Sequence, residues 1–116
     1  MMKGLMKETA LVEVCRGTDD YQNQMYDEYT VDHVCLQPTQ DVVKTTTNTE
    51  VQLVSRLFVD GKRSQPALNW GKLLRHAHEI GGDMYVTIRE VRYTVVNCGE
   101  YRNGWNILHH WEVGLR

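Results

Sequence analysis

The chain has 116 residues and a formal net charge of −2 at pH 7, with a pI of about 6.2. This length predicts one domain over residues 1–116, because two independent cores would not fit. A protein that mainly binds phosphates needs a strongly basic face, so the charge argues against free nucleic acid as the chief partner. No apolar run approaches the roughly 18–20 residues that cross a bilayer, and residues 1–7 are too charged for a secretory signal. We therefore expect a protein made in a cytosol, without a membrane partner.

The first strand is predicted over residues 8–16. Its apolar residues alternate with polar ones, which places Ala10, Val12 and Val14 on one face. Residues 17–20, with the sequence Gly-Thr-Asp-Asp, then supply turn chemistry, because glycine and aspartate accept the backbone conformations that turns require.

The second strand is predicted over residues 29–36. Val34 and Leu36 face one way, and the opposite face carries Val31, His33 and Cys35. Pro38 ends this strand or places it at an edge, because proline has no N–H to donate to a sheet. The polar, threonine-rich run that follows suits either an exposed edge strand or a long flexible loop.

The strongest central strand is predicted over residues 51–59, which are apolar on both faces. One face carries Val51, Leu53, Leu57 and Val59. The other face carries Val54 and Phe58, and a strand of this kind is usually covered on both sides. Residues 60–61, Asp-Gly, mark the turn that follows.

One short helix is predicted over about residues 69–80. Asn69 is a suitable N-cap, and apolar residues recur at helical spacing along one stripe, namely Trp70, Leu73, Ala77 and Ile80. Gly81 and Gly82 supply the stop, since glycine adopts the left-handed conformation without steric cost. A helix of three turns persists only if this stripe docks on a sheet.

The last third of the chain predicts three further strands. Residues 83–88 and 92–98 pair with each other, and residues 98–106 form a loop. The first of these strands aligns Met84, Val86 and Ile88. The closing strand, residues 107–115, aligns Trp111, Val113 and Leu115 and has to be buried against the rest of the fold.

Together these elements predict a mainly β fold. We expect a small antiparallel β-barrel or sandwich of about six to seven strands, with one short helix covering part of it. The residues expected to form and close the core are Phe58, Trp70, Tyr93, Trp111 and Val113.

The histidines do not predict a metal site. His109 and His110 are adjacent in a strand, so their rings are expected on opposite faces, and His76 and His78 diverge on the helix. The cysteines are odd in number, lie far apart and contain no C-x-x-C pair, so each is interpreted as a small buried hydrophobe: Cys15, Cys35 and Cys98. We expect no metal and no cofactor.

No catalytic constellation is visible in the sequence. Ser55 and Ser64 lack a surrounding glycine elbow, and no H-E-x-x-H motif or phosphate-binding glycine loop occurs. Aromatic residues gather in or near predicted loops, where they can stack on bases, anchor a protein interface or pack over the barrel ends. They are Tyr21, Tyr26, Tyr29, Tyr101 and Trp105.

Several segments, taken in order, resemble one known family. They are Leu57-Phe58-Val59-Asp60, Gly82-Asp83, Val86-Thr87-Ile88, Tyr93-Thr94-Val95-Val96 and Leu108-His109-His110-Trp111-Glu112-Val113. In this order the chain is similar to the small minor capsid proteins of tailed phages and prophages of Gram-positive bacteria, regarded as head-closure, stopper-type components of the head–tail connector. That family usually turns with Asn-Gly after its Val-Thr-Ile strand. Here Arg89 and Glu90 stand at that place, so we expect a different turn.

The resemblance implies a structural virion protein of the head–tail neck and not an enzyme. A ring of such subunits, twelve by analogy, would close the head below the portal or adaptor after DNA packaging and offer the surface for the tail. The implied partners are further copies of the chain, the portal or adaptor protein, a tail-side completion or terminator protein, and the end of the packaged DNA.

In related stoppers a long loop reaches into the channel and holds the DNA in. The resemblance makes residues 40–50 the candidate for this loop, because threonines can pair laterally with identical copies. The candidate residues are Gln40, Asp41, Lys44, Thr45, Thr46, Thr47, Asn48 and Thr49. An edge or disordered loop without a gating role is an equal alternative for this segment.

Two other classes of function remain as alternatives. A small β-barrel that binds nucleic acid would show a salt-sensitive affinity for free DNA at physiological ionic strength. A small metal-dependent enzyme would carry tightly bound zinc. We prefer the connector protein, because it accounts for the C-terminal strand and for the lack of catalytic motifs together.

Overall fold

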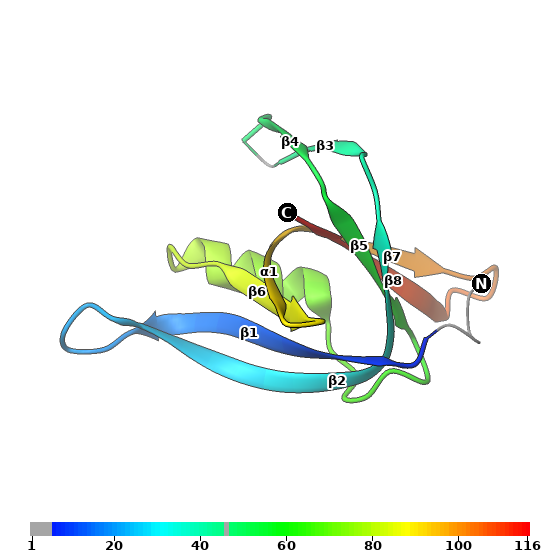
Figure 1. Cartoon of the computed structure of the whole chain (residues 1–116), viewed down its shortest axis with the longest axis horizontal. Helices are drawn as coiled ribbons and strands as arrows, with labels where there is room; N and C mark the ends of the chain where they lie inside the picture. Colours follow the sequence, from blue (N-terminus) through cyan, green and yellow to red (C-terminus); the bar gives the residue numbers. More distant parts are fainter. Residues whose placement is uncertain (1–5, 46) are drawn as a thin grey trace.

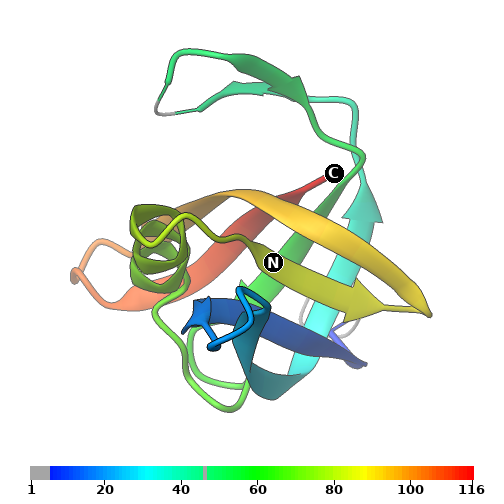
Figure 2. The ribbon, with the colours of Figure 1, turned by 90° about the vertical axis from the view of Figure 1, so that its left-hand side faces the viewer.

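A computed structural model describes residues 6–45 and 47–116, and six antiparallel strands in it form a closed barrel in the order β1-β2-β5-β8-β7-β6 (Figure 1). A separate two-stranded hairpin, β3–β4, stands above the barrel, and one helix packs beside it (Figure 2). The elements are β1 (Glu8–Thr18), β2 (Gln24–Pro38), β3 (Val42–Lys44), β4 (Glu50–Gln52), β5 (Ser55–Asp60), α1 (Trp70–Glu79), β6 (Met84–Ile88), β7 (Val91–Arg102) and β8 (Leu108–Leu115). The mainly β prediction is confirmed, and of its two forms the structure adopts the barrel.

The barrel interior is filled by the alternating apolar residues of its strands. The inward residues of β1, β6 and β8 are all buried, as predicted: Ala10, Val12, Val14, Met84, Val86, Ile88, Trp111, Val113 and Leu115. Pairing of β1 with β6 closes the barrel and brings these three sets of side chains into one cluster. Burial of this cluster is the main driving force for the fold.

Helix α1 begins and ends within one residue of the predicted range of about 69–80. The Asn69 side chain accepts a hydrogen bond from the backbone N–H of Lys72, at 3.1 Å, which caps the first turn. At the other end the N–H of Gly82 donates to the carbonyl of Ala77, and Gly81 has a φ of 78°, in the left-handed region. Within the described residues no helix is long and apolar enough to cross a membrane.

The buried stripe of α1 differs from the prediction at one end. Trp70 and Ala77 are buried as expected, and Leu74 is buried with them. Ile80 is 41% exposed, because the helix ends at Glu79 and Ile80 is already its C-cap. The stripe therefore docks only about two turns of helix on the barrel.

Strand β2 does not alternate as predicted. Glu8 pairs with Val34 but Ala10 pairs with Val31, so β2 carries one extra residue, a β-bulge, between these pairs. His33 lies in the bulge with a φ of 51°. As a result Val31 and Val34, predicted on opposite faces, are both fully buried.

The central strand predicted over residues 51–59 is wrong in extent. It is two strands, β4 and β5, separated at Leu53 and Val54. The N–H of Val54 donates to the carbonyl of Leu115, whereas the N–H of Leu53 donates to Asp41, so the chain changes partners at this point. Val54 is 51% exposed rather than covered, because the hairpin leaves the barrel here.

The loop predicted over residues 98–106 is also wrong in extent. Strand β7 continues to Arg102, and Gly99 pairs with Glu112 of β8. The connection is a tight loop in which the N–H of Asn103 donates to the carbonyl of Ile107, at 3.0 Å. Gly99 therefore lies within a strand and not in a turn.

Three of the five predicted core residues are buried: Trp70, Trp111 and Val113. Tyr93 is half-buried and packs against the core cluster. Phe58 is half-buried outside this cluster, because it faces outward from β5 beside the ring of His110. The prediction of Phe58 as a core residue is therefore wrong.

The β6–β7 turn adopts the geometry for which Asn-Gly is preferred, so the prediction of a different turn is wrong. Arg89 and Glu90 link the two strands with φ angles of 52° and 65°, both in the left-handed region. Replacing Glu90 with glycine is expected to stabilise the protein by about 0.5–1 kcal/mol, since glycine relieves this strain. Urea unfolding measures the change, with Glu90→Ala as the control that removes the charge and keeps the strain. Equal stability of the two variants would contradict the argument.

The start of β1 is held by the carboxylate of Glu8. Arg89 donates to it from Nη2, at 2.8 Å, and the N–H of Leu36 donates at 3.1 Å. The hydrogen bond from Arg89, assisted by that from Leu36, lowers the pKa of Glu8 below its ordinary value of 4.5.

A pH dependence follows from this lowered pKa. The contribution of Glu8 to stability is fully present above about pH 4.5 and is lost as the pH falls through the folded pKa. We therefore expect Glu8→Gln to unfold at lower urea concentration than the wild type at pH 6. This difference should shrink towards pH 3, and a difference that grows on acidification would contradict the assignment.

Candidate functional site: the projecting hairpin and the barrel face at its base

The β3–β4 hairpin is the most prominent projection from the upper side of the barrel (Figure 2). Three residue pairs hold it together: Val42 with Gln52, Val43 with Val51, and Lys44 with Glu50. Within the described residues the hairpin is a sheet of its own, so the outer edges of both strands are open. Open edges offer backbone groups for pairing with another chain.

The hairpin tip is a closed turn built from threonines. Thr47 Oγ1 lies 3.0 Å from the Thr45 hydroxyl and 3.3 Å from that of Thr49. The N–H of Thr45 donates to the carbonyl of Thr49, and Asn48 has a φ of 63°. The described residues of this segment therefore pair as a hairpin. Thr46, the remaining predicted residue of the tip, lies outside the described residues.

The hairpin base is fixed to the barrel by Asp41. Its carboxylate pairs with Arg56 of β5 at 3.2 Å, and its carbonyl accepts from the N–H of Leu53. Leu53 is 1% exposed, so this connection is also packed. Of the predicted loop residues, Gln40 and Asp41 thus lie at the base, Lys44 ends β3, and Thr45, Thr47, Asn48 and Thr49 lie at the tip.

A hollow of about 350 Å³ lies on the outer barrel face at this base. Arg56, Phe58, Tyr101 and Glu112 line it together with residues 37–39 and Asp41. The register explains this grouping, because Phe58 pairs with Glu112 and Tyr101 with His110 on neighbouring strands. Side chains that the sequence separates by more than 50 positions therefore share one surface.

His109 and His110 are in contact, which contradicts the predicted divergence of their rings. Their Nδ1 atoms lie 2.8 Å apart, with the rings at 79°. The β7–β8 register shifts here, since Tyr101 pairs with His110 but Arg102 pairs with Leu108. This irregularity leaves His109 without a ladder partner on β7 and lets its ring turn towards His110.

His110 is the centre of a small polar and aromatic cluster that the sequence did not predict. Its Nε2 lies 2.9 Å from a carboxylate oxygen of Glu112, and its ring stacks on Tyr101 with centroids 4.9 Å apart. Within the described part of the chain, no group of three or more histidine, cysteine or acidic side chains is arranged to hold a metal ion.

The loop aromatics separate into two groups. Tyr26 and Tyr29 pack against the core, and Tyr26 also meets Tyr85 edge-on with centroids 5.9 Å apart. Tyr21 and Trp105 are each 85% exposed at the tips of the β1–β2 and β7–β8 hairpins. Packing therefore explains the first group, whereas the second group projects into solvent.

Most arginines in the described residues are neutralised locally. Arg56 pairs with Asp41, Arg92 with Glu13 at 3.2 Å, and further pairs are Arg16–Asp27, Arg89–Glu8 and Arg102–Glu100. Arg92 also lies 3.8 Å above the ring of Tyr85. These arginines contribute structural pairs, and they do not form a bare basic face for phosphates.

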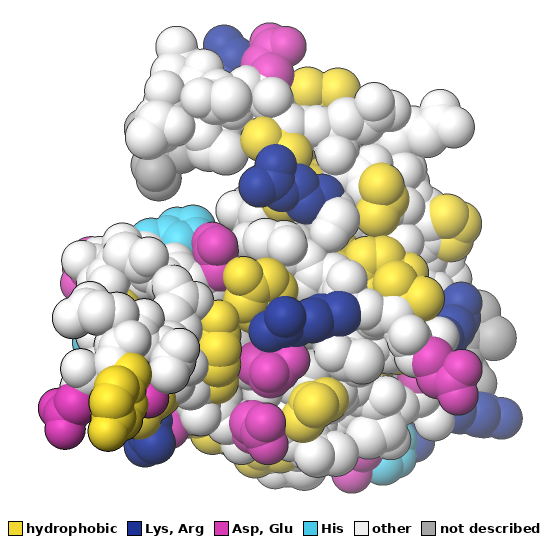
Figure 3. Space-filling model, turned by 60° about the vertical axis from the view of Figure 1, so that its left-hand side comes forward, with side chains coloured by type: hydrophobic (Ala, Val, Ile, Leu, Met, Phe, Trp, Pro, Cys, Tyr) yellow, Lys and Arg dark blue, Asp and Glu magenta, His cyan; other side chains and the backbone are white. Residues whose placement is uncertain are grey.

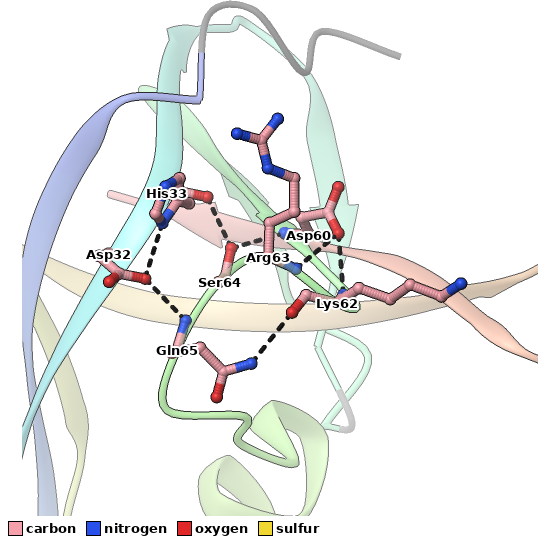
Figure 4. Close-up of polar contacts among 7 residues, drawn as sticks. All are labelled: Asp32, His33, Asp60, Lys62, Arg63, Ser64 and Gln65. Atoms are coloured by element: carbon pink, nitrogen blue, oxygen red, sulfur yellow. Dashed lines mark hydrogen bonds and ion pairs between the residues drawn. The ribbon is translucent and has the colours of Figure 1, made fainter.

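The loop after β5 is pinned against the β2 bulge by a polar network (Figure 4). The buried hydroxyl of Ser64 donates to the carbonyl of His33, at 2.6 Å, and accepts from the N–H of Asp60. Asp60 accepts from the N–H groups of Lys62 and Arg63, which closes the turn. The side chains of these two basic residues remain exposed.

Asp32 completes this network from the bulge. Its carboxylate accepts from the N–H of Gln65 and pairs with His33 at 3.0 Å. The contact with His33, followed by the bond from Gln65, lowers the pKa of Asp32. The bulge that upset the predicted alternation therefore holds a surface loop in place.

No family model, curated protein or solved structure matches the chain.

Proposed function

We propose that this protein is a structural component of a phage head–tail connector, of the head-closure type. Copies form a ring below the portal or adaptor, close the head after DNA packaging, and offer a surface for the tail. The chain acts through its surfaces and its projecting hairpin and not as a catalyst.

The observation that carries this proposal is the β3–β4 hairpin. It leaves the barrel at residues 53–54, pairs only within itself among the described residues, and ends in a polar turn. Its base is joined to β5 by the Asp41–Arg56 pair, so the hairpin projects from one side of the barrel. A polar projection with open strand edges suits a channel in which identical hairpins meet, because backbone groups and hydroxyls then find partners.

The barrel supports the same role. Its interior is filled by packed side chains, which leaves the outer faces and the hairpins as the surfaces for partners. A ring needs two different contact patches on each subunit. Tyr21 and Trp105 are exposed at two hairpin tips. Tyrosine and tryptophan are residue types that often anchor protein interfaces.

Shortening the hairpin tests the proposal. Residues 45–49 are replaced by Asn-Gly, which joins Lys44 to Glu50 through a two-residue turn. In phage particles that carry this variant we expect tails to attach but the packaged DNA to leak, measured as DNA protected from nuclease. Particles with Glu90→Gly, a turn change elsewhere on the barrel, serve as the control and should retain their DNA. Full DNA retention with the shortened hairpin would contradict its gating role.

A further inference from the structure

A groove lies between α1, β7 and the β3–β4 hairpin. Its volume is about 560 Å³, and Figure 3 shows the surface indented beneath the hairpin. The buried and half-buried part of its lining holds the apolar residues Leu74, Val96 and Cys98, together with Gly71, Thr45 and Asn97. The exposed rim carries Lys44, Arg75, His78 and Glu79. The groove is thus largely apolar within and carries charges of both signs at its rim.

Burial raises the pKa of the Cys98 thiol to about 12. The thiol is therefore neutral at physiological pH and contributes to the groove as an apolar group. A large apolar side chain suits such a site better than a charged one.

The β7–β8 loop, at the right in Figure 1, presents one such side chain. Trp105 is 85% exposed, and the neighbouring Ile107 is 50% exposed. The Asn103 side chain accepts from the N–H of Trp105, at 2.9 Å, and from that of Ile107, at 3.1 Å. Arg102 also donates to the carbonyl of Asn106, at 3.0 Å. An aromatic residue on a loop ordered in this way loses little conformational entropy on binding.

The two ends also carry complementary charges. The β1–β2 tip contains Asp19 and the exposed Asp20, and the loop after β5 presents Lys62 and Arg63. Figure 4 shows the Lys62 side chain extending away from the pinned loop. In Figure 1 this loop lies below the β7–β8 loop, in the right-hand half of the molecule, whereas the acidic β1–β2 tip lies at the far left. The basic loop and the acidic tip therefore point to different neighbours when copies associate in one direction.

We propose that copies of this chain associate head to tail, with Trp105 of one copy entering the groove of the next. In the same contact, Lys62 and Arg63 of the first copy face Asp19 and Asp20 of the second. Each copy thus uses two different patches, which is the arrangement that generates rings. The inference rests on the proposed function, since it names the contact between subunits of the proposed ring.

Self-association of the purified full chain gives the first test. Trp70 and Trp111 are at most 4% exposed, so a change in tryptophan emission with protein concentration reports mainly on Trp105. We expect a blue shift as concentration rises and a matching increase in mass by sedimentation. Trp105→Ala should weaken association at least tenfold, whereas Val91→Ser, which removes an apolar residue 48% exposed on the β6–β7 turn, should not.

Charge exchange tests the second half of the contact. Asp20→Lys alone, and Lys62→Asp with Arg63→Asp, should each weaken association. All three substitutions in one chain should restore part of it, because Asp20→Lys then faces two acidic residues while Asp19 is unchanged. Loss without restoration would contradict the proposed pairing of the acidic tip with the basic loop.

Cross-linking tests the direction of the contact. A short bismaleimide should join Gly104→Cys to Arg75→Cys when the two variants are mixed, because the Trp105 loop then meets the groove rim. With Cys98→Ser in both variants to remove the thiol that lines the groove, Gly104→Cys by itself should remain monomeric on a denaturing gel, and Cys98→Ser alone controls for the remaining native thiols. Equal cross-linking of Gly104→Cys with itself would overturn the head-to-tail arrangement.

The failure of this contact is distinguishable from the failure of the proposed function. A chain that stays monomeric up to about 1 mM, or that associates equally well as Trp105→Ala, contradicts the contact. The proposed function is judged separately by DNA retention in particles. If Trp105→Ala impairs particles but leaves self-association unchanged, Trp105 binds a different protein and the inference is wrong.

Discussion

Replacing Trp111 with alanine is expected to lower the free energy of unfolding by about 3–5 kcal/mol. Trp111 is 4% exposed on β8 and belongs to the barrel core. A Cβ added at Gly71 would lie 3.6 Å from its ring, so the first turn of α1 rests on this side chain. Removing the ring therefore opens a cavity where the helix docks on the closing strand. Urea unfolding followed by far-ultraviolet circular dichroism measures the loss without relying on tryptophan emission.

The same substitution at Trp105 is the matched control. Trp105 is 85% exposed, so Trp105→Ala should change the stability of the monomer by less than about 0.5 kcal/mol. Trp111→Phe should cost clearly less than Trp111→Ala. The indole N–H of Trp111 has no hydrogen-bond partner among the described residues, so phenylalanine loses volume but no bond. Equal losses from Trp111→Ala and Trp105→Ala would contradict the packing described for β8.

Replacing Gly61 with alanine is expected to destabilise the fold by about 3 kcal/mol. A Cβ at this position would lie 2.4 Å from the carbonyl oxygen of Leu108 and 3.1 Å from that of His109. Both are backbone atoms of β8 and cannot rotate away. The N–H of Gly61 also donates to the His109 carbonyl, at 2.9 Å, so relief of the clash would stretch this bond. The midpoint of urea unfolding measures the effect.

Gly104→Ala is the control for this prediction. No atom lies within 4 Å of a Cβ placed at Gly104, and its φ is not in the left-handed region. Its stability should therefore stay within about 0.5 kcal/mol of the wild type. If Gly61→Ala changed the stability as little as Gly104→Ala, this would contradict the close approach of the turn after β5 to β8.

The predictable parts of the fold are those where local pattern and burial agree. Alternation in β1, β6 and β8 placed Val12, Val86 and Val113 inward, and all three are fully buried. The N-cap Asn69 and the glycines at 81 and 82 located the helix, because caps depend on neighbouring residues only. These features need no knowledge of distant partners.

The errors arise where a distant segment decides the local conformation. The bulge at His33 is held by Ser64, 31 residues away, so alternation within β2 alone gives no sign of it. The break at Leu53 and Val54 depends on bonds to Asp41 and Leu115. Arg89 and Glu90 both have positive φ angles, which neither residue type favours. The ion pair of Arg89 with Glu8 helps to hold this turn in place.

The candidate site was predictable only in part. The threonine run marked the exposed segment. The composition of the run does not show that the segment pairs as a hairpin, because the pairing depends on contacts such as Val43 with Val51. The contact of His109 with His110 depends on the irregular β7–β8 register. The sequence leaves three uses open for a loop aromatic such as Trp105: stacking on bases, anchoring an interface or packing over a barrel end. Its 85% exposure argues against packing, and only the arrangement of the loop in space reveals that exposure.

The proposed function is to close a DNA-filled head as part of a connector ring. The most direct measurement compares particles assembled with and without the chain, scoring nuclease-protected DNA and attached tails. We expect particles without it to lose their DNA and to accumulate beside full-length tails that fail to join. Normal, tailed and DNA-filled particles made in its absence would contradict the claim.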